Sequence, residues 1–152
     1  QYEISNWSKP GFTCRHNLQY WRNLPYIGLG PGAHGYAGGI RYSTILSPQQ
    51  YIQRIQKANS SYAFPLTPAT VESVKVDRDN EISETLIMGL RLTREGILWH
   101  TFKERFGADL RDVHGPILDR FVGYHLLEVD DDRVRLTDQG RLLSNVIFRE
   151  LV

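Results

Sequence analysis

The sequence predicts an α+β protein built from two modules, and two observations support this prediction. In the first module, residues 1–61, short strand-like runs alternate with glycine-rich turns and two helical patterns. In the second module, residues 80–152, the expected elements follow the order helix, strand, helix, helix, hairpin, helix, which is that of a winged helix. Residues 62–79 contain two prolines between these patterns, so we expect them to form a linker.

Turn and cap residues set the limits of the elements in the first module. Ser47 at the N-cap and Pro48 at the first helical position predict a helix over residues 48–58. Tyr51 and Ile52 lie on one side of that helix. The other expected elements are strands over 2–5, 25–29 (short and buried) and 38–44, a short helix over 16–23, and a short strand or helical turn over 71–76.

The second module is defined by apolar residues at helical spacing. Asn80 is a suitable cap for a helix whose apolar positions include Ile82, Leu86 and Leu90. The remaining expected elements are an apolar piece over 96–98, helices over 99–106 and 113–127, a hairpin over 127–136 and a final helix over 137–151.

Charge argues against nucleic acid as a partner, although winged helices often bind DNA. The net charge is +1. The helix expected over residues 113–127 carries Arg120 as its one permanent cation, and the hairpin turn Asp130-Asp131-Asp132 would repel phosphates. We therefore expect no nucleic-acid binding.

The front of the chain is nevertheless basic. Up to Lys57 there is one acid, Glu3. Such a balance suits an anionic ligand such as a phosphate or a propionate, although dispersed cations usually form solvated surface. The cations are Lys9, Arg15, Arg22, Arg41, Arg54 and Lys57.

The single cysteine, Cys14, limits both the cellular compartment and the metal chemistry that we expect. It cannot form an internal disulfide, which fits a reducing, cytoplasmic compartment. It also cannot supply the several thiolates of an iron–sulfur cluster. No signal peptide or membrane-spanning run is evident. The chain begins directly in a strand-like run, so we expect it to be a piece of a larger protein.

Residues 15–36 hold the candidate chemistry. His16 precedes two large aromatics, Tyr20 and Trp21. A neutral imidazole ligates haem iron, and aromatic rings stack on a flat macrocycle. The alternative is a structural histidine with two core aromatics, and spacing alone favours that alternative.

A glycine-rich turn follows, Gly28-Leu29-Gly30-Pro31-Gly32-Ala33-His34. Glycine there lets backbone approach a cofactor, with His34 as a nearby acid or base. The turn does not match the dinucleotide-binding or phosphate-loop patterns, and a tight exit from a strand explains it equally well.

The ordered motifs resemble the radical S-adenosylmethionine (SAM) family related to oxygen-independent coproporphyrinogen III oxidase. In the first module these are Tyr2 to Asn6, Lys9-Pro10-Gly11, Arg15-His16-Asn17 with Tyr20-Trp21, and the turn Gly28 to His34. In the second module they are Glu84 to Leu86, Gly89 to Leu92, Glu95-Gly96 and Leu136 to Arg141, which look like the family's HemN-type C-terminal domain.

This resemblance implies the end of a partial (β/α) radical SAM barrel at 1–61, followed by a winged-helix-like domain at 80–152. The parent protein would hold SAM and a 4Fe-4S cluster. The cluster cysteines are absent from this chain, so the missing N-terminal barrel portion is an expected partner and the chain alone should do no radical chemistry.

The motif of His16, Asn17, Tyr20 and Trp21 is similar to that of the haem chaperone branch, HemW. It implies His16 as the haem iron ligand and the other three as its support. The resemblance also implies that Gly30, Gly32, Ala33 and His34 lie near SAM. Gly35 is a departure, because relatives usually have serine there, which leaves a side-chain contact at that position open.

The implied function is haem binding and delivery to haem-accepting proteins. One alternative is the oxidase itself, which decarboxylates porphyrin propionates oxidatively. The other is a non-catalytic docking module formed by residues 80–152. Peripheral association with a membrane is compatible with each of them.

Overall fold

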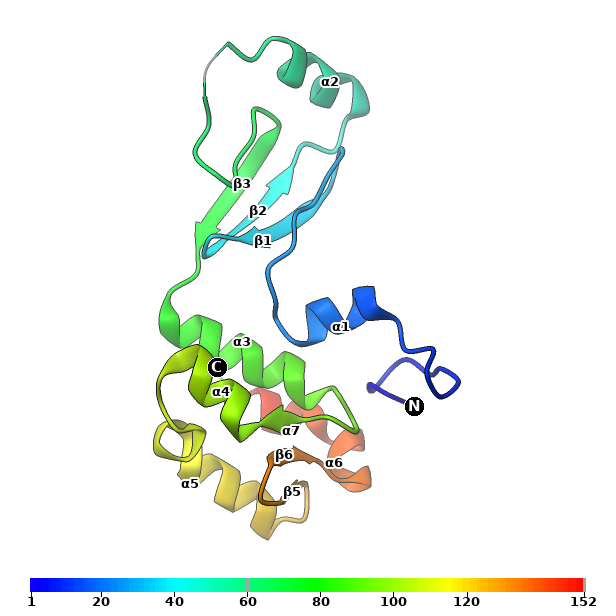
Figure 1. The fold of residues 1–152 in the computed structure, drawn as a ribbon, viewed down its shortest axis with the longest axis vertical. Coiled ribbons are helices and arrows are strands. Elements are labelled where there is room, and N and C mark those ends of the chain that lie inside the picture. The colour runs from blue at the N-terminus through cyan, green and yellow to red at the C-terminus, as the bar shows by residue number, and fades with distance from the viewer. Residues whose placement is uncertain (60, 152) are drawn as a thin grey trace. The chain divides into compact units, whose positions relative to one another are not determined.

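The computed structural model describes residues 1–59 and 61–151 and has a mixed α+β architecture. It divides into two compact units (Figure 1). Unit 1 contains Gln1–Asn23 and Asp79–Val152, and unit 2 contains Leu24–Arg78. This division differs from the expected one, because residues 1–23 pack with the second module.

Unit 1 combines helices with a small antiparallel sheet of strand order β4-β6-β5. Val134 of the central strand pairs with Ile97 on one side and Val129 on the other. The helices are α1 (Arg15–Trp21), α3 (Arg78–Leu90), α4 (Trp99–Phe106), α5 (Leu110–Gly123), α6 (Asp138–Leu142) and α7 (Ser144–Phe148), and the strands are β4 (Ile97–Leu98), β5 (Leu127–Val129) and β6 (Arg133–Leu136).

The core of unit 1 is formed by the apolar positions that helical spacing predicts. Leu86 and Leu90 of α3 are fully buried, as are Val134 and Leu136 of β6 and Ile147 of α7. Each buried aliphatic side chain of this kind contributes about 1.5–3 kcal/mol relative to an exposed one. The core therefore joins the helices to the hairpin.

Local caps fix the helix ends in unit 1. The Asp109 side chain accepts a hydrogen bond from the Arg111 N–H, so α5 begins three residues before the expected start at Val113. Thr137 accepts from the Gly140 N–H at the start of α6. Gly107 ends α4 in the left-handed conformation, with φ of 65°.

Unit 2 is an antiparallel sheet of order β1-β2-β3 with one helix. Gly38 and Gly39 join the first two strands in a two-residue turn, and both have positive φ. The Ser47 side chain caps α2 as predicted. The elements are β1 (His34–Ala37), β2 (Ile40–Thr44), α2 (Pro48–Gln56) and β3 (Thr70–Lys75).

Unit 2 buries few of its large apolar side chains. Tyr36, Tyr42 and Ala69 are its buried apolar residues of note. In β3, every residue after Thr70 is exposed. Exposed large apolar side chains of this unit are Ile27, Leu29, Leu46, Ile52, Ile55, Tyr62, Phe64, Val71 and Val74.

Three expected elements differ from the structure. Residues 2–5 form a turn closed by a single bridge between Glu3 and Asn6 instead of a strand. Residues 25–29 pair only through Tyr26, and Leu29 is 84% exposed, so the expected buried strand is wrong. The final helix is split at Leu143, whose backbone is not helical. β3 lies within the stretch expected to be a linker.

Candidate functional site

The candidate haem motif lies on α1, and its histidine is exposed. The rings of His16 and Tyr20 meet edge to face, with centroids 4.8 Å apart and planes at 88°. One helical turn separates the two residues, which places them on the same side of the helix. The Asn17 amide donates to the Tyr2 hydroxyl at 3.1 Å. The expected ligand and its neighbours therefore do lie together.

Trp21 is held by a cation. The Arg91 guanidinium carbon lies 4.5 Å from the centroid of the Trp21 ring. The indole N–H of Trp21 is buried and has no hydrogen-bond partner among the described residues. Arg91 also lies 3.5 Å from the carboxylate of Glu3, a side chain that is 0% exposed. Trp21 is thus half-buried against Arg91 and is not one of the buried core residues, whereas His16 is exposed.

The Glu3 carboxylate is shared between two segments of unit 1. One of its oxygens accepts hydrogen bonds from the Ser5 N–H at 2.9 Å and from the Asn6 amide. The other faces Arg91, whose carbonyl accepts from the Ile4 N–H at 3.0 Å. The N-terminal segment is therefore attached to the end of α3 by charge and by backbone.

The chain leaves α1 through Asn23, which is buried with φ of 48°. Its amide donates to the Thr85 hydroxyl on α3 at 3.0 Å. Arg105 of α4 donates to the Asn23 carbonyl at 2.8 Å and to the Arg22 carbonyl at 3.1 Å. The same guanidinium pairs with Glu81 at 2.6 Å. These bonds fix the C-terminal end of α1 on α3 and α4.

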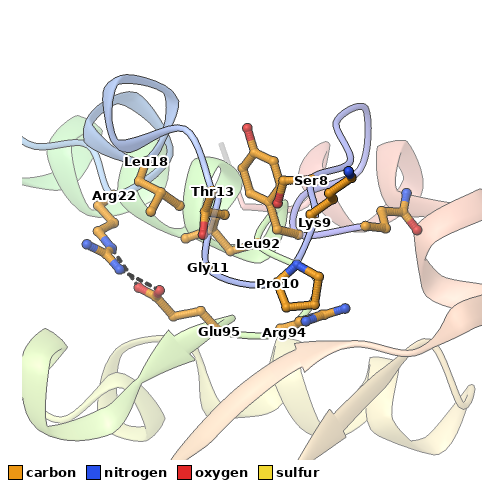
Figure 2. Close-up of a pocket in the computed structure, with 12 residues that line it drawn as sticks. Ser8, Lys9, Pro10, Gly11, Thr13, Leu18, Arg22, Leu92, Arg94 and Glu95 are labelled. Carbon is orange, nitrogen blue, oxygen red and sulfur yellow. Dashed lines mark hydrogen bonds and ion pairs between the residues drawn. The ribbon is translucent and has the colours of Figure 1, made fainter.

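Arg22 makes a two-pronged ion pair with Glu95, at 2.8 and 2.7 Å. These hydrogen bonds from the guanidinium to Glu95 raise the pKa of Arg22 further above its ordinary value. The pair lies beside a pocket of about 240 Å³ (Figure 2). The loop 8–13, one side of α1 and the segment 92–95 line this pocket, which we call the cationic pocket.

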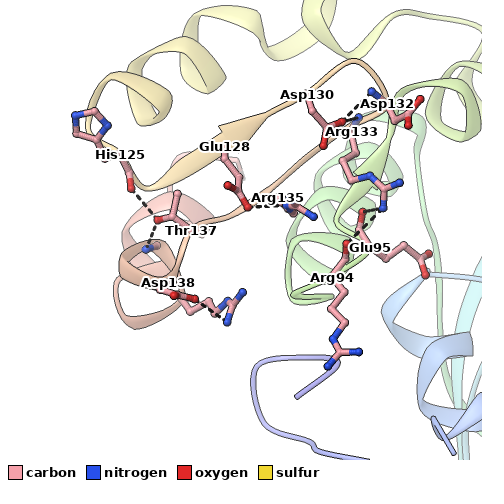
Figure 3. Close-up of polar contacts among 12 residues, drawn as sticks. Arg94, Glu95, His125, Glu128, Asp130, Asp132, Arg133, Arg135, Thr137 and Asp138 are labelled. Carbon is pink, nitrogen blue, oxygen red and sulfur yellow. Dashed lines mark hydrogen bonds and ion pairs between the residues drawn. The ribbon is translucent and has the colours of Figure 1, made fainter. Parts of the chain in front are cut away.

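The hairpin turn of unit 1 is acidic for a structural reason (Figure 3). The Asp130 carboxylate accepts from the N–H groups of Asp132 and Arg133, both at 2.9 Å. These backbone bonds lower the pKa of Asp130. Arg135 pairs with Glu128 across the strands at 2.6 Å. The turn is thus an aspartate-stabilised loop.

The glycine-rich turn lies in unit 2, apart from the haem motif in the division of the chain. A Cβ at Gly28 would overlap the carbonyl of His34, so only glycine allows these segments to approach. The N–H groups of Gly32 and Ala33 are both engaged, with Ile45 O at 2.9 Å and the Thr44 hydroxyl at 2.9 Å. The fold therefore uses these two donors itself.

Gly30 is the open position of the turn. Its φ is 99°, and nothing lies within 4 Å of the place that a Cβ would take. Its carbonyl accepts from the Thr44 hydroxyl at 2.6 Å. Thr44 thus holds the turn, and the described residues leave the space beside Gly30 open.

His34 borders a second, open pocket of about 180 Å³ on the sheet of unit 2. His34, Ser43 and Glu72 are aligned across β1, β2 and β3. The Ser43 hydroxyl donates to Glu72 at 3.3 Å, and Arg41 also lines the pocket. Sequence reasoning named Arg41 only as one of the dispersed cations and did not select Ser43 or Glu72. The period of two in residues 40–44 and 70–75 is the signal that places them on one face.

Gly35 faces the ring of Tyr42 across the β1–β2 pair. A Cβ at Gly35 would overlap that ring, whose hydroxyl accepts from the Gly28 N–H at 3.2 Å. Tyr42 therefore occupies the space of a side chain at position 35. At position 35, where relatives usually have serine, the Tyr42 ring fills the space beside the glycine and its hydroxyl supports the turn.

Residues 1–59 and 61–151 contain no group of three or more histidine, cysteine or acidic side chains arranged to hold a metal ion. Within the same ranges, every helix is too short or too polar to cross a bilayer.

Comparison with known proteins gives consistent matches. A model of the HemN C-terminal domain matches residues 76–143. Heme chaperone HemW of Escherichia coli (strain K12) is 63% identical over 148 residues, which cover 97% of this chain and 36% of that protein. HemW of Bacillus subtilis (strain 168) is 35% identical over 148 residues, 97% of this chain and 37% of that protein. The chain thus spans about a third of the length of these curated relatives.

One solved structure, of coproporphyrinogen III oxidase (HemN) from Escherichia coli, titled a radical SAM enzyme, aligns with a TM-score of 0.59 at 19% identity. The alignment covers 84% of this chain and 28% of that one. At this identity the likeness shows the fold alone. The sequence matches confirm the family resemblance that the ordered motifs predicted.

Proposed function

Because the chain is a relative of the HemW and HemN proteins, and residues 76–143 belong to the HemN C-terminal domain family, we propose that it is part of a HemW-like radical SAM protein. That protein would bind haem and deliver it to haem-accepting proteins in the cytoplasm. The names of the relatives support haem as the ligand. The exposed thiol of Cys14 suits a reducing compartment.

The observation that carries the proposal is the exposed imidazole of His16 on α1, set against the edge of Tyr20. An axial ligand must present a ring nitrogen to the iron. A transient carrier must also release its cargo, which an exposed ligand favours over one enclosed in a core. Trp21, stacked under Arg91, would hold the helix while His16 stays accessible.

Haem titration of the full-length protein tests this role. With His16→Ala, we expect loss of the Soret shift that accompanies axial ligation by histidine. His100→Ala is the matched control, because His100 is also exposed on a helix of unit 1. Unchanged haem spectra and affinity in His16→Ala would remove His16 as the ligand.

We further propose that unit 2 is the end of the radical SAM barrel and that Gly30, Gly32, Ala33 and His34 lie near SAM. Two features support this proposal, the open backbone at Gly30 and the many exposed apolar side chains of the unit, which a larger barrel would cover. With the N–H groups of Gly32 and Ala33 engaged in the fold, Gly30 is the position for backbone contact.

The chain's residues do not fit the 4Fe-4S cluster, because Cys14 is its one thiol. The cluster belongs to the part of the parent protein outside this chain. The element order of residues 79–151, with the sheet β4-β6-β5, supports a winged-helix-like C-terminal domain. Its acidic turn at Asp130 gives phosphates no support.

A further inference from the structure

Three cations from separate segments of unit 1 line the cationic pocket (Figure 2). They are Lys9 in the N-terminal loop, Arg22 on α1 and Arg94 after α3. We propose that this pocket binds one anionic oxygen group, a carboxylate or a phosphate, between Lys9 and Arg94. The names of the HemW relatives described above do not assign a ligand to this pocket.

The charge balance of the lining favours an anion. Glu95 is the one acid there, and its carboxylate is already engaged by Arg22 at 2.7 Å. The side chains of Lys9 and Arg94 have no ion pair or hydrogen bond within the described residues. Two positive side chains without a counter-ion among the described residues therefore line the same pocket, where like charges raise each other's energy unless an anion enters.

Neutral donors complete the lining. The hydroxyls of Ser8 and Thr13 border the pocket, and Gly11 between them has φ of 80° with open space beside its Cα. Hydroxyl and backbone N–H groups next to cations are the donors that proteins use for carboxylate and phosphate oxygens. The segment that carries Arg94 is attached to the hairpin, because Arg133 donates to the Arg94 carbonyl at 3.4 Å.

Size limits what enters. About 240 Å³ is smaller than the cavities of roughly 300–1,000 Å³ that enclose whole drug-sized ligands. The pocket therefore accommodates a single anionic group, and a porphyrin ring stays outside it.

Two sources share this chemistry, a free phosphate and a propionate of haem. The second rests on the proposed function, whereas the first does not. Leu18 and Arg22 line the pocket from α1, while His16 lies roughly 200° around the helix from Leu18. The pocket is thus on a different side of α1 from the candidate iron ligand, and the two can be tested separately.

The test uses the full-length protein with Lys9→Gln and Arg94→Gln combined. The control variant combines Lys103→Gln with Arg149→Gln, which removes the same charge from exposed positions of unit 1. Neither the pocket variant nor the control variant alters Arg22 or Glu95. Inorganic phosphate is titrated at low ionic strength and followed by phosphorus NMR. We expect phosphate to bind the wild type and the control equally, and the pocket variant about tenfold more weakly.

A second arm compares haem with its dimethyl ester, in which both carboxylates are masked. If the group is a propionate, the pocket variant loses about tenfold in affinity for haem and none for the ester, while the Soret position stays that of the wild type. Weakening of phosphate alone assigns a free phosphate. Equal affinities of all three proteins for every probe would overturn the proposal. Failure of haem to bind the wild type at all would refute the proposed function and leave the phosphate arm decisive.

Discussion

Replacing Arg91 by methionine should loosen the N-terminal segment that supports the haem motif. The change keeps the apolar stem and removes the guanidinium that contacts both Glu3 and Trp21. The Glu3 carboxylate, 0% exposed, would then lie buried without its counter-charge. Removing one partner of a buried ion pair costs about 3–5 kcal/mol.

Two features of the structure reduce that figure. The pair is separated by 3.5 Å and Arg91 is 25% exposed, so part of the charge is already solvated. Glu3 also keeps its hydrogen bonds from the Ser5 N–H and the Asn6 amide. We expect a loss of about 2 kcal/mol, which corresponds to a roughly 30-fold larger equilibrium constant for local opening.

Amide hydrogen exchange measures this opening directly. The reporters are the N–H groups of Ile4 and Thr93, which bond the Arg91 and Tyr2 carbonyls at 3.0 and 3.1 Å. Arg135→Met is the control, because its pair with Glu128 is exposed and worth less than about 1 kcal/mol. Exchange at both reporters no faster in Arg91→Met than in this control would refute the reasoning.

Two further predictions concern a histidine and a glycine. Burial lowers the pKa of His114 below its ordinary value of 6.5. The unfolded chain therefore takes up protons first, and stability falls as pH drops below that value. His114→Gln should make the loss between about pH 7.5 and about pH 5.5 smaller than in wild type or His100→Gln, measured by urea unfolding, and parallel curves for all three would contradict this. Gly35→Ser should displace the Tyr42 ring and break its bond to the Gly28 N–H, lowering the melting temperature. Adding Tyr42→Ala to Gly35→Ser should remove the overlap. If a double-mutant cycle shows that Gly35→Ser destabilises the protein equally with and without the Tyr42 ring, the overlap is not the cause of the loss.

Much of unit 1 was predictable because its signals are local. Helical spacing of Leu86 and Leu90 defines α3, and Gly107 ends α4, without reference to distant residues. The prediction for residues 25–29 was wrong because it depended on contacts with distant residues. An apolar run predicts burial only if a partner surface is present, and Ile27 is 56% exposed here. The same limit applies to β3, whose strand is formed by pairing with β2.

The sequence pointed to the residues of the candidate site but not to the residues that hold them in place. His16, Tyr20 and Trp21 stand out in the sequence, but Arg91 lies 70 positions from Trp21 and no local pattern joins them. The cations of the first module were individually visible and looked like solvated surface. Only the fold shows that Lys9 and Arg94 line one pocket.

The polar contacts of α1 with the rest of unit 1 explain how this helix can carry an exposed candidate ligand, His16. Seven residues with none buried are too short to form a stable helix alone. Apolar burial of the side that His16 and Tyr20 occupy would stabilise the helix but would also cover the histidine. Polar contacts at the C-terminal end of the helix avoid this conflict. Arg22 pairs with Glu95, and Arg105 donates to the carbonyls of Arg22 and Asn23. Glu95 and Arg105 both belong to the HemN-type domain, so this domain positions the candidate haem motif. From the sequence, we had expected the motif to belong to the barrel.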